Sequence, residues 1–296
     1  MDFLVKFQQY SDKVEKWLQD NLQFDLNCLE RTVYESMKYS LTAGGKRLRP
    51  VLSLAVCDML NLDEEKVLPF ACAIELIHTY SLIHDDLPCM DNSDFRRGKP
   101  TNHKVFGEAM AVLAGDGLLN LAFEIMLNES IKEENNSLYC ARAAKLIADA
   151  SGTKGMIGGQ VIDIEAVGKK ITYDELCQMH KKKTGALIKA SILMPARLFN
   201  VPDEITESLE IYAESLGLAF QIKDDILDVE GNSQIVGKPV GTDEKNDKST
   251  FVTLLGLNKA KALLKESTQR AADSLKNIDN SGFLTEMACW IAERNK

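Results

Sequence analysis

The chain has 296 residues, of which 45% are hydrophobic and 27% are charged, so it is long and apolar enough to bury a large core. Its net charge of −9 argues against general nucleic-acid binding and electrostatic membrane attachment, because both need a cationic surface. Seven scattered cysteines with no CxxC pair fit reduced thiols, so we expect a cytoplasmic protein.

The sequence predicts neither a targeting segment nor a membrane span. Residues 1–21 form an amphipathic pattern with acidic residues, which suits neither a signal peptide nor a transit peptide. No apolar run is expected to reach the length of a membrane span, because Glu75 and His78 interrupt the best candidate. We therefore expect no stable association with a membrane.

Apolar residues at steps of three and four predict helices along almost the whole chain. The expected ranges are 3–19, 27–43, 50–60, 69–87, 107–130, 136–150, 154–167, 173–199, 204–229, 249–256, 259–276 and 282–294. No sustained alternation of polar and apolar residues predicts a sheet. We expect a single all-α domain over residues 1–296, packed as a helix bundle.

Several of the expected helix ends have a local cause. Gly44 and Gly45 can stop the second helix, and Pro50 suits the first position of the third. Further signals are a capping box of Thr172 with Glu175, an N-cap at Ser281, and a kink or helix end at Pro195.

The first acidic cluster lies in SLIHDDLPCMDNSDFRRGKP, residues 81–100, directly after an apolar helix. Asp85 and Asp91 are six residues apart, a spacing that an unbroken helix would not align well. Pro88 disfavours helix at Leu87, so the chain is expected to loop back there.

The second acidic cluster is QIKDDILDVE, residues 221–230. Asp224 and Asp228 are four residues apart, which places both carboxylates on one helix face, whereas Asp225 points elsewhere. A solvated face would explain a lone motif of this kind. Both clusters, however, end core-facing stretches, and oxygen ligands without nearby Cys or His favour Mg²⁺.

Basic residues recur beside the acidic clusters. GGKRLRP, residues 44–50, places Lys46, Arg47 and Arg49 in a turn that leads into a helix N-terminus, which favours an anion. The others are Arg96 and Arg97 after the first acidic cluster, Lys181 to Lys183 before Thr184, and Lys238 and Lys248 in a glycine-bearing segment. Each could be a solvated patch, but their recurrence favours a diphosphate held by Mg²⁺, Arg and Lys.

Five ordered motifs resemble the short-chain trans-isoprenyl diphosphate synthases, and among these the bacterial-type farnesyl diphosphate synthases. They are GGKRLRP, LIHDDLPCMDNSDFRRGKPT, GGQVIDI, KKTGALI and AFQIKDDILDVEG, within a resemblance that runs from about residue 34 to 256. It implies an isoprenoid synthase fold, with about ten or more mostly antiparallel helices around a central cavity, and a homodimer. It also implies head-to-tail condensation of isopentenyl diphosphate with dimethylallyl and then geranyl diphosphate.

The resemblance assigns roles to individual residues. Asp85 and Asp91 would bind two Mg²⁺ ions on the allylic diphosphate and Asp224 a third, with Mn²⁺ as an alternative ion. The supporting acids would be Asp86, Asp225 and Asp228. Isopentenyl diphosphate would be held by Gly45, Lys46, Arg49, His78 and Arg97. The allylic diphosphate would be held by Arg96, Lys183, Thr184, Gln221, Lys238 and Lys248.

The implied chemistry agrees with these residue types. A diphosphate becomes a good leaving group once cations neutralise its developing charge, a task for Asp85 and Asp224 through their metal ions. The allylic cation then needs oxygen dipoles, for which Thr184, Gln221 and the carbonyl of Lys183 are the candidates. The departing diphosphate can accept the final proton. Water must be excluded, and residues 230–248 are the candidate lid.

Tyr80 and Ser81 are the candidates for setting product length. Tyr80 lies five residues before Asp85, where a bulky side chain would block growth beyond the C15 product, although ordinary core packing would also explain it. The segment LPCMDNSD resembles the corresponding segment of the plant-type geranylgeranyl synthases. Farnesyl diphosphate is the predicted product and the C20 diphosphate is the alternative.

Two rival functions explain part of the sequence. A terpene cyclase would share the fold and the first aspartate motif, but it has no use for GGKRLRP and usually has a different metal motif in place of DDILD. A non-catalytic synthase subunit is expected to lose one aspartate motif, and both are present here. These features favour an active prenyl synthase.

Overall fold

The structure, a computed structural model, describes residues 2–230 and 249–294. It divides into two compact units, one of Met1–Leu54 with Asp63–Ala144 and the other of Ala55–Leu62 with Lys145–Lys296. The predicted single domain stays a prediction. Lys238, Lys248 and residues 231–248 of the predicted lid lie outside the described residues.

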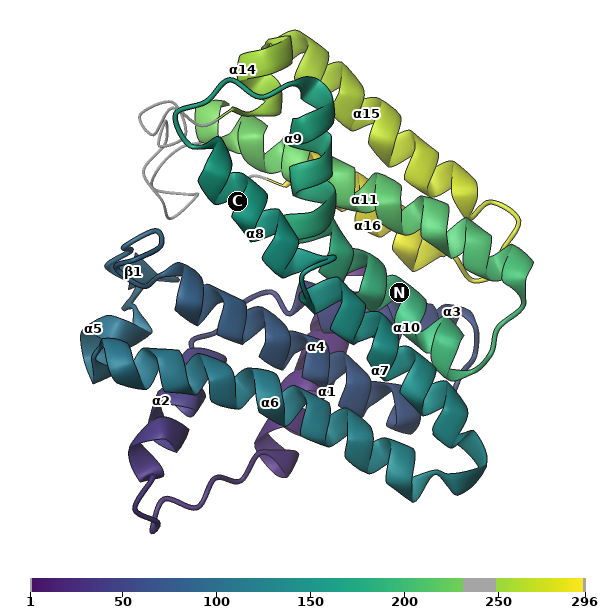
Figure 1. Cartoon of the computed structure of the whole chain (residues 1–296). Coiled ribbons are helices and arrows are strands. Elements are labelled where there is room, and N and C mark those ends of the chain that lie inside the picture. The colour runs from purple at the N-terminus through teal and green to yellow at the C-terminus, as the bar shows by residue number, and fades with distance from the viewer. Residues whose placement is uncertain (1, 231–248, 295–296) are drawn as a thin grey trace. The chain divides into compact units, whose positions relative to one another are not determined.

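The first unit is built around the apolar helix that ends in the first acidic cluster. Its elements are α1 (Phe3–Asn21), α2 (Arg31–Leu41), the start of α3 (Leu48–Met59), α4 (Glu64–Asp85), β1 (Phe95–Arg96), β2 (Lys99–Pro100), α5 (Asn102–Phe106), α6 (Glu108–Lys132), η1 (Glu134–Asn136) and the start of α7 (Ser137–Ser151). Helices α4 and α6 pack side by side (Figure 1). Gly115 permits their close approach, because a Cβ there would lie 2.8 Å from Cε1 of His84.

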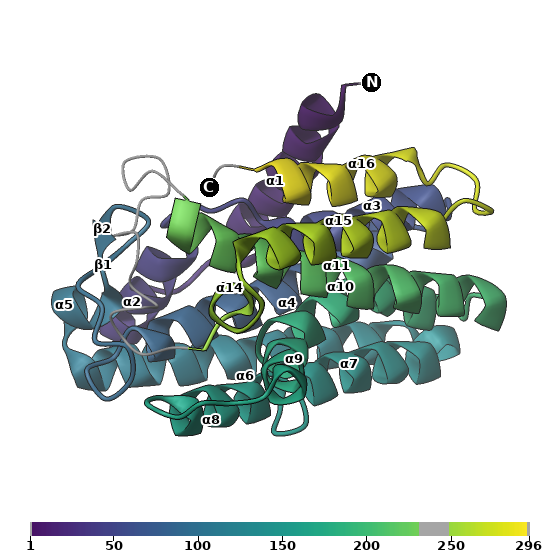
Figure 2. The same cartoon turned by 90° about the horizontal axis from the view of Figure 1, so that it is seen from above.

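The second unit contains the second acidic cluster. Besides the ends of α3 and α7, its elements are α8 (Met156–Ala166), α9 (Tyr173–His180), η2 (Lys181–Gly185), α10 (Ala186–Leu198), α11 (Asp203–Glu230), α14 (Phe251–Leu255), α15 (Leu257–Ser274) and α16 (Gly282–Glu293). Helices α11 and α15 lie side by side in both views (Figures 1 and 2). The hydroxyl of Tyr212 in α11 donates to the carbonyl of Leu284 in α16 at 2.7 Å, which fixes a third helix to this pair.

The all-α prediction is confirmed, and most predicted helices occur within a few residues of their expected bounds. The capping box is also confirmed: Thr172 accepts from the amide of Glu175 at 3.3 Å, and the Glu175 carboxylate accepts from the amide of Thr172 at 2.7 Å. The pattern of apolar residues was therefore sufficient to place most of the helices.

The prediction of no sheet is wrong for one short hairpin. Strands β1 and β2 pair antiparallel, with Phe95 opposite Pro100. The two residues of the turn, Arg97 and Gly98, have φ of 54° and 76°, which is the backbone that two-residue hairpin turns require. Strands of two residues are too short to produce a visible alternation in the sequence.

Two predicted helix boundaries also differ from the structure. The range 173–199 is interrupted at η2, a single π-helical turn, whereas Pro195 lies inside α10 and the helix ends three residues later. Pro50 is the third residue of α3 instead of the first, a position whose N–H has no helical partner in any case. The predicted N-cap at Ser281 is confirmed in position, since α16 begins at the next residue, although the Ser281 side chain makes no capping hydrogen bond.

Two helices are as long and apolar as a membrane span, which the sequence analysis did not expect. They are α4 and α6, and 72% of the apolar window of α4 is buried, as in the core helix of a globular unit. Only 33% of the window of α6 is buried. Length and composition alone are weak support for a membrane span, but the exposed apolar surface of α6 needs another explanation.

Candidate functional site

The first aspartate motif is a helix end with a returning loop, as predicted. Helix α4 ends at Asp85, and the amide of Asp91 donates to the carbonyl of Asp85 at 2.9 Å. This bond brings the two aspartates together although they are six residues apart in the sequence. Asp85 is half-buried and Asp91 is exposed, so both belong to the surface of the first unit.

The second aspartate of this motif has a structural partner. Asp86 is only 3% exposed and accepts two hydrogen bonds of 2.7 Å from Nε and Nη2 of Arg96. This bidentate pair ties the β1–β2 hairpin to the end of α4. Arg96 was predicted to hold the allylic diphosphate. In the structure it already binds a protein carboxylate, and its side chain remains 24% exposed.

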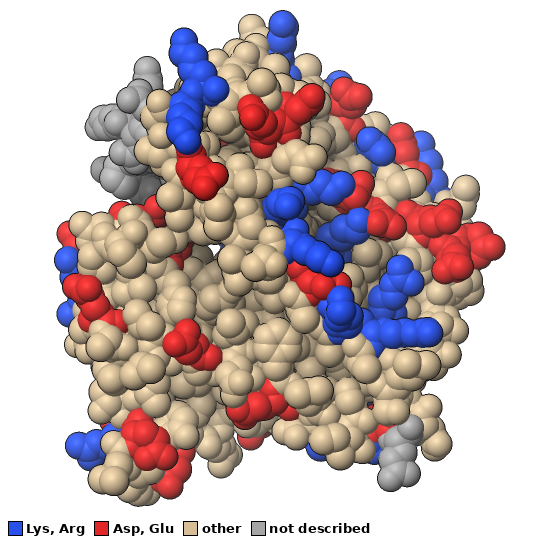
Figure 3. Space-filling model, in the orientation of Figure 1, with Lys and Arg blue, Asp and Glu red and all other residues tan. Residues whose placement is uncertain are grey.

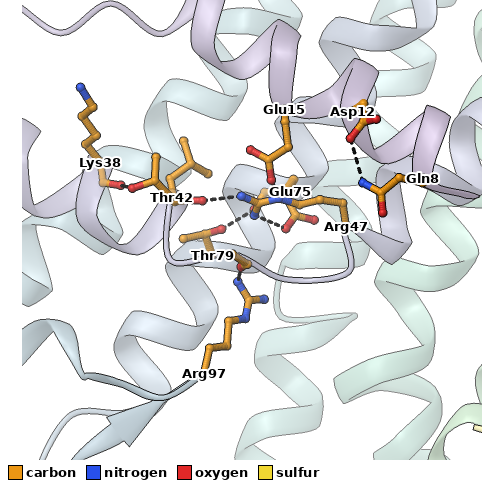
Figure 4. A network of polar contacts seen from close by, with 11 residues as sticks. Gln8, Asp12, Glu15, Lys38, Thr42, Arg47, Glu75, Thr79 and Arg97 are labelled. Atoms are coloured by element: carbon orange, nitrogen blue, oxygen red, sulfur yellow. Dashed lines mark hydrogen bonds and ion pairs between the residues drawn. The ribbon is translucent and has the colours of Figure 1, made fainter.

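The turn GGKRLRP is held by its middle arginine. The side chain of Arg47 is buried and donates to Glu75 at 2.8 Å, to Glu15 at 2.6 Å and to the carbonyl of Leu41 at 2.5 Å (Figure 4). Its predicted place among the anion-binding cations is therefore wrong. The neighbour Lys46 is exposed instead, on a turn that cannot easily move.

Arg97 reaches the same turn from the hairpin. Its Nη1 donates to the carbonyl of Gly44, and its guanidinium lies over Gly45 (Figure 4). A Cβ on Gly45 would lie 2.6 Å from Cζ of Arg97, and Gly45 has a φ of 138°. Both facts explain why this position needs glycine.

His78 marks an electropositive region in the first unit. Burial lowers the pKa of His78 well below its usual value of 6.5, and the charges of four arginines lower it further. These are Arg49, Arg97, Arg96 and Arg47. A neutral imidazole surrounded by guanidinium groups forms a site suited to a polyanion. Of the residues predicted to hold isopentenyl diphosphate, Arg49 and Arg97 therefore lie within electrostatic range of His78, and Arg97 also contacts Gly45.

The π-helical turn η2 carries the predicted catalytic residues of the second unit. Gly159 of α8 lies directly against it, because a Cβ at this position would be 2.5 Å from Cα of Lys183. On α11, a Cβ at Gly217 would lie 3.3 Å from Cα of Gly185. Glycines on two helices thus allow the backbone of η2 to pass between them, and π-turns of this kind are frequent at functional sites.

A chain of hydrogen bonds orients the predicted oxygen dipoles. The hydroxyl of Thr184 donates to Oε1 of Gln221 at 3.2 Å, and Nε2 of Gln221 donates to Asp225 at 3.2 Å. Asp225 is 4% exposed and also accepts from the amide of Phe251, the first residue of α14, at 2.7 Å. The buried carboxylate therefore fixes the orientation of both Gln221 and Thr184.

Lys183 lines a cavity of about 120 Å³ in the second unit. Its ammonium donates to Asp163 at 2.7 Å, and Gln221 and Asp225 line the same cavity. Asp163 comes from the GGQVIDI motif. The structure makes it the partner of Lys183.

The carboxylates of the second aspartate motif lie near the end of α11. Asp224 and Asp228 are half-buried and one helical turn apart, as predicted. Asp224 also pairs with Arg294 at 2.5 Å, a contact across 70 residues that the sequence analysis missed.

The donor set of each motif fits Mg²⁺ that arrives with a diphosphate. Over the described part of the chain, no three His, Cys, Asp or Glu side chains gather into a group that could hold a metal alone. Each motif does present a pair of carboxylates, Asp85 with Asp91 and Asp224 with Asp228. Magnesium is usually bound by one or two carboxylates, together with waters and substrate phosphates.

Tyr80 is buried in the contact of α4 with α6. Its ring packs edge-on against His84 at 5.6 Å, and burial, followed by the charge of Asp116 in α6, raises the pKa of its phenol. Ser81 donates to the carbonyl of His78 at 2.8 Å. This position is compatible with both a chain-length role and ordinary packing, so the chain-length role stays a prediction.

Comparisons with known proteins agree with these motifs. The sequence model described as polyprenyl synthetase matches residues 30–281. A farnesyl diphosphate synthase from Micrococcus luteus is 48% identical, over 89% of this chain and 90% of the relative. A chloroplastic geranylgeranyl pyrophosphate synthase from Capsicum annuum is 44% identical, over 89% of this chain and 72% of the relative. The crystal structure of an FPP/GFPP synthase from Zymomonas mobilis has a TM-score of 0.87 at 36% identity, covering 98% of both chains.

The environment of His78 predicts proton uptake when an anion binds. Without a ligand its imidazole is neutral at pH 7, because its pKa lies well below 6.5. Inorganic diphosphate would offset the charges of the surrounding arginines and raise this pKa. We expect the Cε1–H resonance of His78 to titrate at higher pH in its presence. NMR can assign the resonance through His78→Asn, since the chain has four histidines. An unchanged titration at saturating diphosphate would contradict the anion site.

The contact of Gly159 with η2 predicts a large effect of one methyl group. Gly159→Ala should destabilise the protein by about 1–3 kcal/mol, the usual cost of overpacking, because the new Cβ would meet the backbone of Lys183. Chemical denaturation measures the change. Gly282→Ala is the matched control, since a Cβ there meets nothing within 4 Å. Equal stability of the two variants would show that η2 does not pack tightly against Gly159.

Proposed function

The chain belongs to the polyprenyl synthetase family, and on this premise we propose that it makes farnesyl diphosphate. It would condense isopentenyl diphosphate head-to-tail with dimethylallyl and then geranyl diphosphate. One observation carries the assignment. The second aspartate of each motif, Asp86 or Asp225, is buried and accepts a hydrogen bond from the protein. The first aspartate, Asp85 or Asp224, stays half-buried, and each motif contains one further aspartate. Both motifs therefore keep a carboxylate pair for a cation, as a synthase needs and a subunit with one degenerate motif would not.

The carboxylate pairs hold the magnesium ions in this proposal. Asp85, Asp91 and Asp224 would be the ligands, with Asp86, Asp225 and Asp228 in support. When bound there, Mg²⁺ would supply Lewis-acid neutralisation of the charge on the leaving diphosphate. The number of ions, three per active site, and the use of Mn²⁺ belong to the proposal.

Protein cations complete the neutralisation of the leaving group. Lys183 would bind the allylic diphosphate, and its present partner Asp163 orients the ammonium through a hydrogen bond of 2.7 Å. Arg96 would contribute the part of its guanidinium that Asp86 leaves accessible. Lys238 and Lys248 remain proposed ligands from sequence alone.

Oxygen dipoles would then stabilise the allylic cation. The Thr184 hydroxyl and Gln221 are held by the hydrogen-bond chain that ends at Asp225, so they need no reorganisation during the reaction. Isopentenyl diphosphate would lie at Gly45, Lys46, Arg49, His78 and Arg97. After the new C–C bond forms, the released diphosphate would accept the proton that restores the double bond.

Two further observations support the proposed cellular location and the proposed homodimer. All seven cysteines are free thiols in the structure, which supports a cytoplasmic location.

Leu113, Leu127 and Ile131 lie exposed along α6, and a hydrogen bond from Asn120 to Glu124 lies between the first of them and the other two. An exposed apolar face of this kind supports the proposed homodimer better than a membrane contact, because polar residues divide it.

Product analysis tests the proposed function. Radiolabelled isopentenyl diphosphate is incubated with dimethylallyl or geranyl diphosphate and Mg²⁺, and the dephosphorylated products are sized by chromatography. We expect a C15 alcohol that disappears with EDTA and falls by on the order of 100-fold or more in Asp85→Asn. Asp20→Asn, an exposed aspartate of α1, is the matched control.

The same assay separates the alternatives. A C20 product from the wild-type chain would replace farnesyl with geranylgeranyl diphosphate and keep the mechanism. Tyr80→Ala should lengthen the product, and an unchanged C15 product would reduce Tyr80 to a packing residue. Folded protein that condenses neither primer would overturn the synthase and favour a non-catalytic subunit.

The homodimer is tested by sedimentation. The wild-type chain should sediment at twice its 32.9 kDa mass, whereas Leu113→Glu combined with Leu127→Glu should give monomers, since buried carboxylates would oppose association. Leu4→Glu combined with Leu29→Glu places the same charges on exposed leucines away from α6. A monomeric wild-type chain, or equal behaviour of the two double variants, would contradict an interface on α6.

A further inference from the structure

The second unit contains a larger cavity that the proposed reaction does not use. Its volume is about 600 Å³, compared with about 120 Å³ for the cavity that Lys183 lines. It lies among α9, η2, α10, α11 and α15. Neither the aspartates of the two motifs nor Lys183, Thr184 or Gln221 line it.

The lining of this cavity is strongly basic. Its cations are Lys154, Lys181, Lys182, Lys189 and Arg270, and its carboxylates are Glu214 and Glu266. Figure 3 shows lysine and arginine side chains gathered over this region of the second unit. Such a concentration is unusual in a chain whose net charge is −9.

Protein carboxylates neutralise only part of this charge. Lys181 pairs with Glu214 at 3.2 Å, and Lys189 pairs with Glu214 at 3.0 Å and with Glu210. Within residues 2–230 and 249–294, no carboxylate lies at ion-pair distance from Lys154, Lys182 or Arg270. A hydrogen bond from Lys145 lowers the pKa of Asp149 and the charge of Lys154 lowers it further, so Lys154 is compensated in part. Three cations without an ion-pair partner still repel each other around one cavity, and a bound polyanion would reduce that cost.

The rest of the lining suits an organic group beside the anion. Tyr173, Ala186, Leu218 and Leu263 supply apolar surface. Burial raises the pKa of Tyr173 to about 12, so its phenol remains a neutral hydrogen-bond donor. A volume of about 600 Å³ is in the usual range for small-molecule sites, which are mostly apolar with a few polar anchors.

One residue lines both this cavity and the cavity of Lys183. His180 lines both, and its ring stacks on Phe251 at 5.4 Å. Both ring nitrogens are buried and have no hydrogen-bond partner among the described residues. On the next turn, Lys181 and Lys182 face the large cavity whereas Lys183 lines the small one. The turn η2 is thus a shared wall.

We propose that the large cavity is a second phosphate site that binds a small organic di- or triphosphate and weakens binding of the allylic diphosphate across η2. The two ligands would be anions on opposite sides of one helical turn, so they oppose each other electrostatically. The binding part stands on the cavity alone, whereas the effect on the allylic substrate rests on the proposed function. A nucleotide and a prenyl diphosphate share this chemistry.

Calorimetric titration with inorganic diphosphate tests the binding part. The cavity variant combines Lys154→Glu with Arg270→Glu and leaves the residues of the proposed active site untouched. The wild-type chain should show one more class of diphosphate-binding sites than this variant. Arg197→Glu combined with Lys265→Glu is the matched control, because it reverses two exposed charges outside the cavity. Equal stoichiometry and affinity in the wild-type chain and the cavity variant would overturn the site.

The class of ligand follows from two further probes. Binding of ATP at least tenfold tighter than inorganic diphosphate, lost in the cavity variant, would identify a nucleotide site. The same result with farnesyl diphosphate would identify a prenyl diphosphate site. If neither binds tighter than inorganic diphosphate, the phosphate site stands and the role of the apolar wall is overturned.

Kinetics test the coupling. The tighter probe should raise KM for geranyl diphosphate severalfold at unchanged kcat, and it should lose part of this effect in the cavity variant. An equal effect in both proteins would place the inhibition at the active site and overturn the coupling. If no condensation occurs but the extra class of sites is present, the proposed function fails and the second phosphate site remains.

Discussion

A carboxylate that leaves water must find a donor inside the protein, and the local order of both units depends on this requirement. Removing an ion from water costs several kcal/mol even after relaxation, unless hydrogen bonds and an opposite charge replace the water. Glu75, Asp86 and Asp225 are each less than 5% exposed. Their partners are Arg47, Arg96 and the amide of Phe251, which belong to a loop, to the short strand β1 and to the start of α14. Each buried acid therefore fixes a segment that has few apolar contacts to hold it.

The residues left at the surface are the sequence neighbours of those that are buried. Asp86 is buried and Asp85 remains half-buried; Asp225 is buried and Asp224 remains half-buried; Arg47 is buried and Lys46 remains exposed. Adjacent side chains of a helix or a tight turn point in different directions, so one of a like-charged pair can anchor the backbone while the other stays in contact with solvent. This division explains why the motifs contain adjacent residues of like charge, and it gives the supporting acids Asp86 and Asp225 a structural role.

Local signals were predictable from the sequence, and contacts between distant segments were not. The loop at Pro88 and the box at Thr172 depend on neighbouring residues, so their chemistry could be recognised directly. The turn η2 depends on Gly159 and Gly217, which lie on two other helices. The partner of Asp224 is 70 residues away. Nothing in DDILD or GGKRLRP distinguishes the charge that will be buried from the charge that will not, because this depends on where the donor lies in the folded chain.

Both aspartate motifs occupy the unfavourable end of a helix. Asp85 is the last residue of α4, and Asp228 lies in the last turn of α11, which contains no basic residue. The carbonyl groups at a helix C-terminus already carry about half a negative charge, so carboxylates there are repelled by the helix as well as by each other. Arg294 relieves this repulsion at Asp224 only in part, because Asp228 shares the same helix face. A globular protein gains no stability from such an arrangement. It becomes favourable when a divalent cation is bound, so the same feature that costs stability in the metal-free chain provides a strong field for Mg²⁺ and the diphosphate it carries.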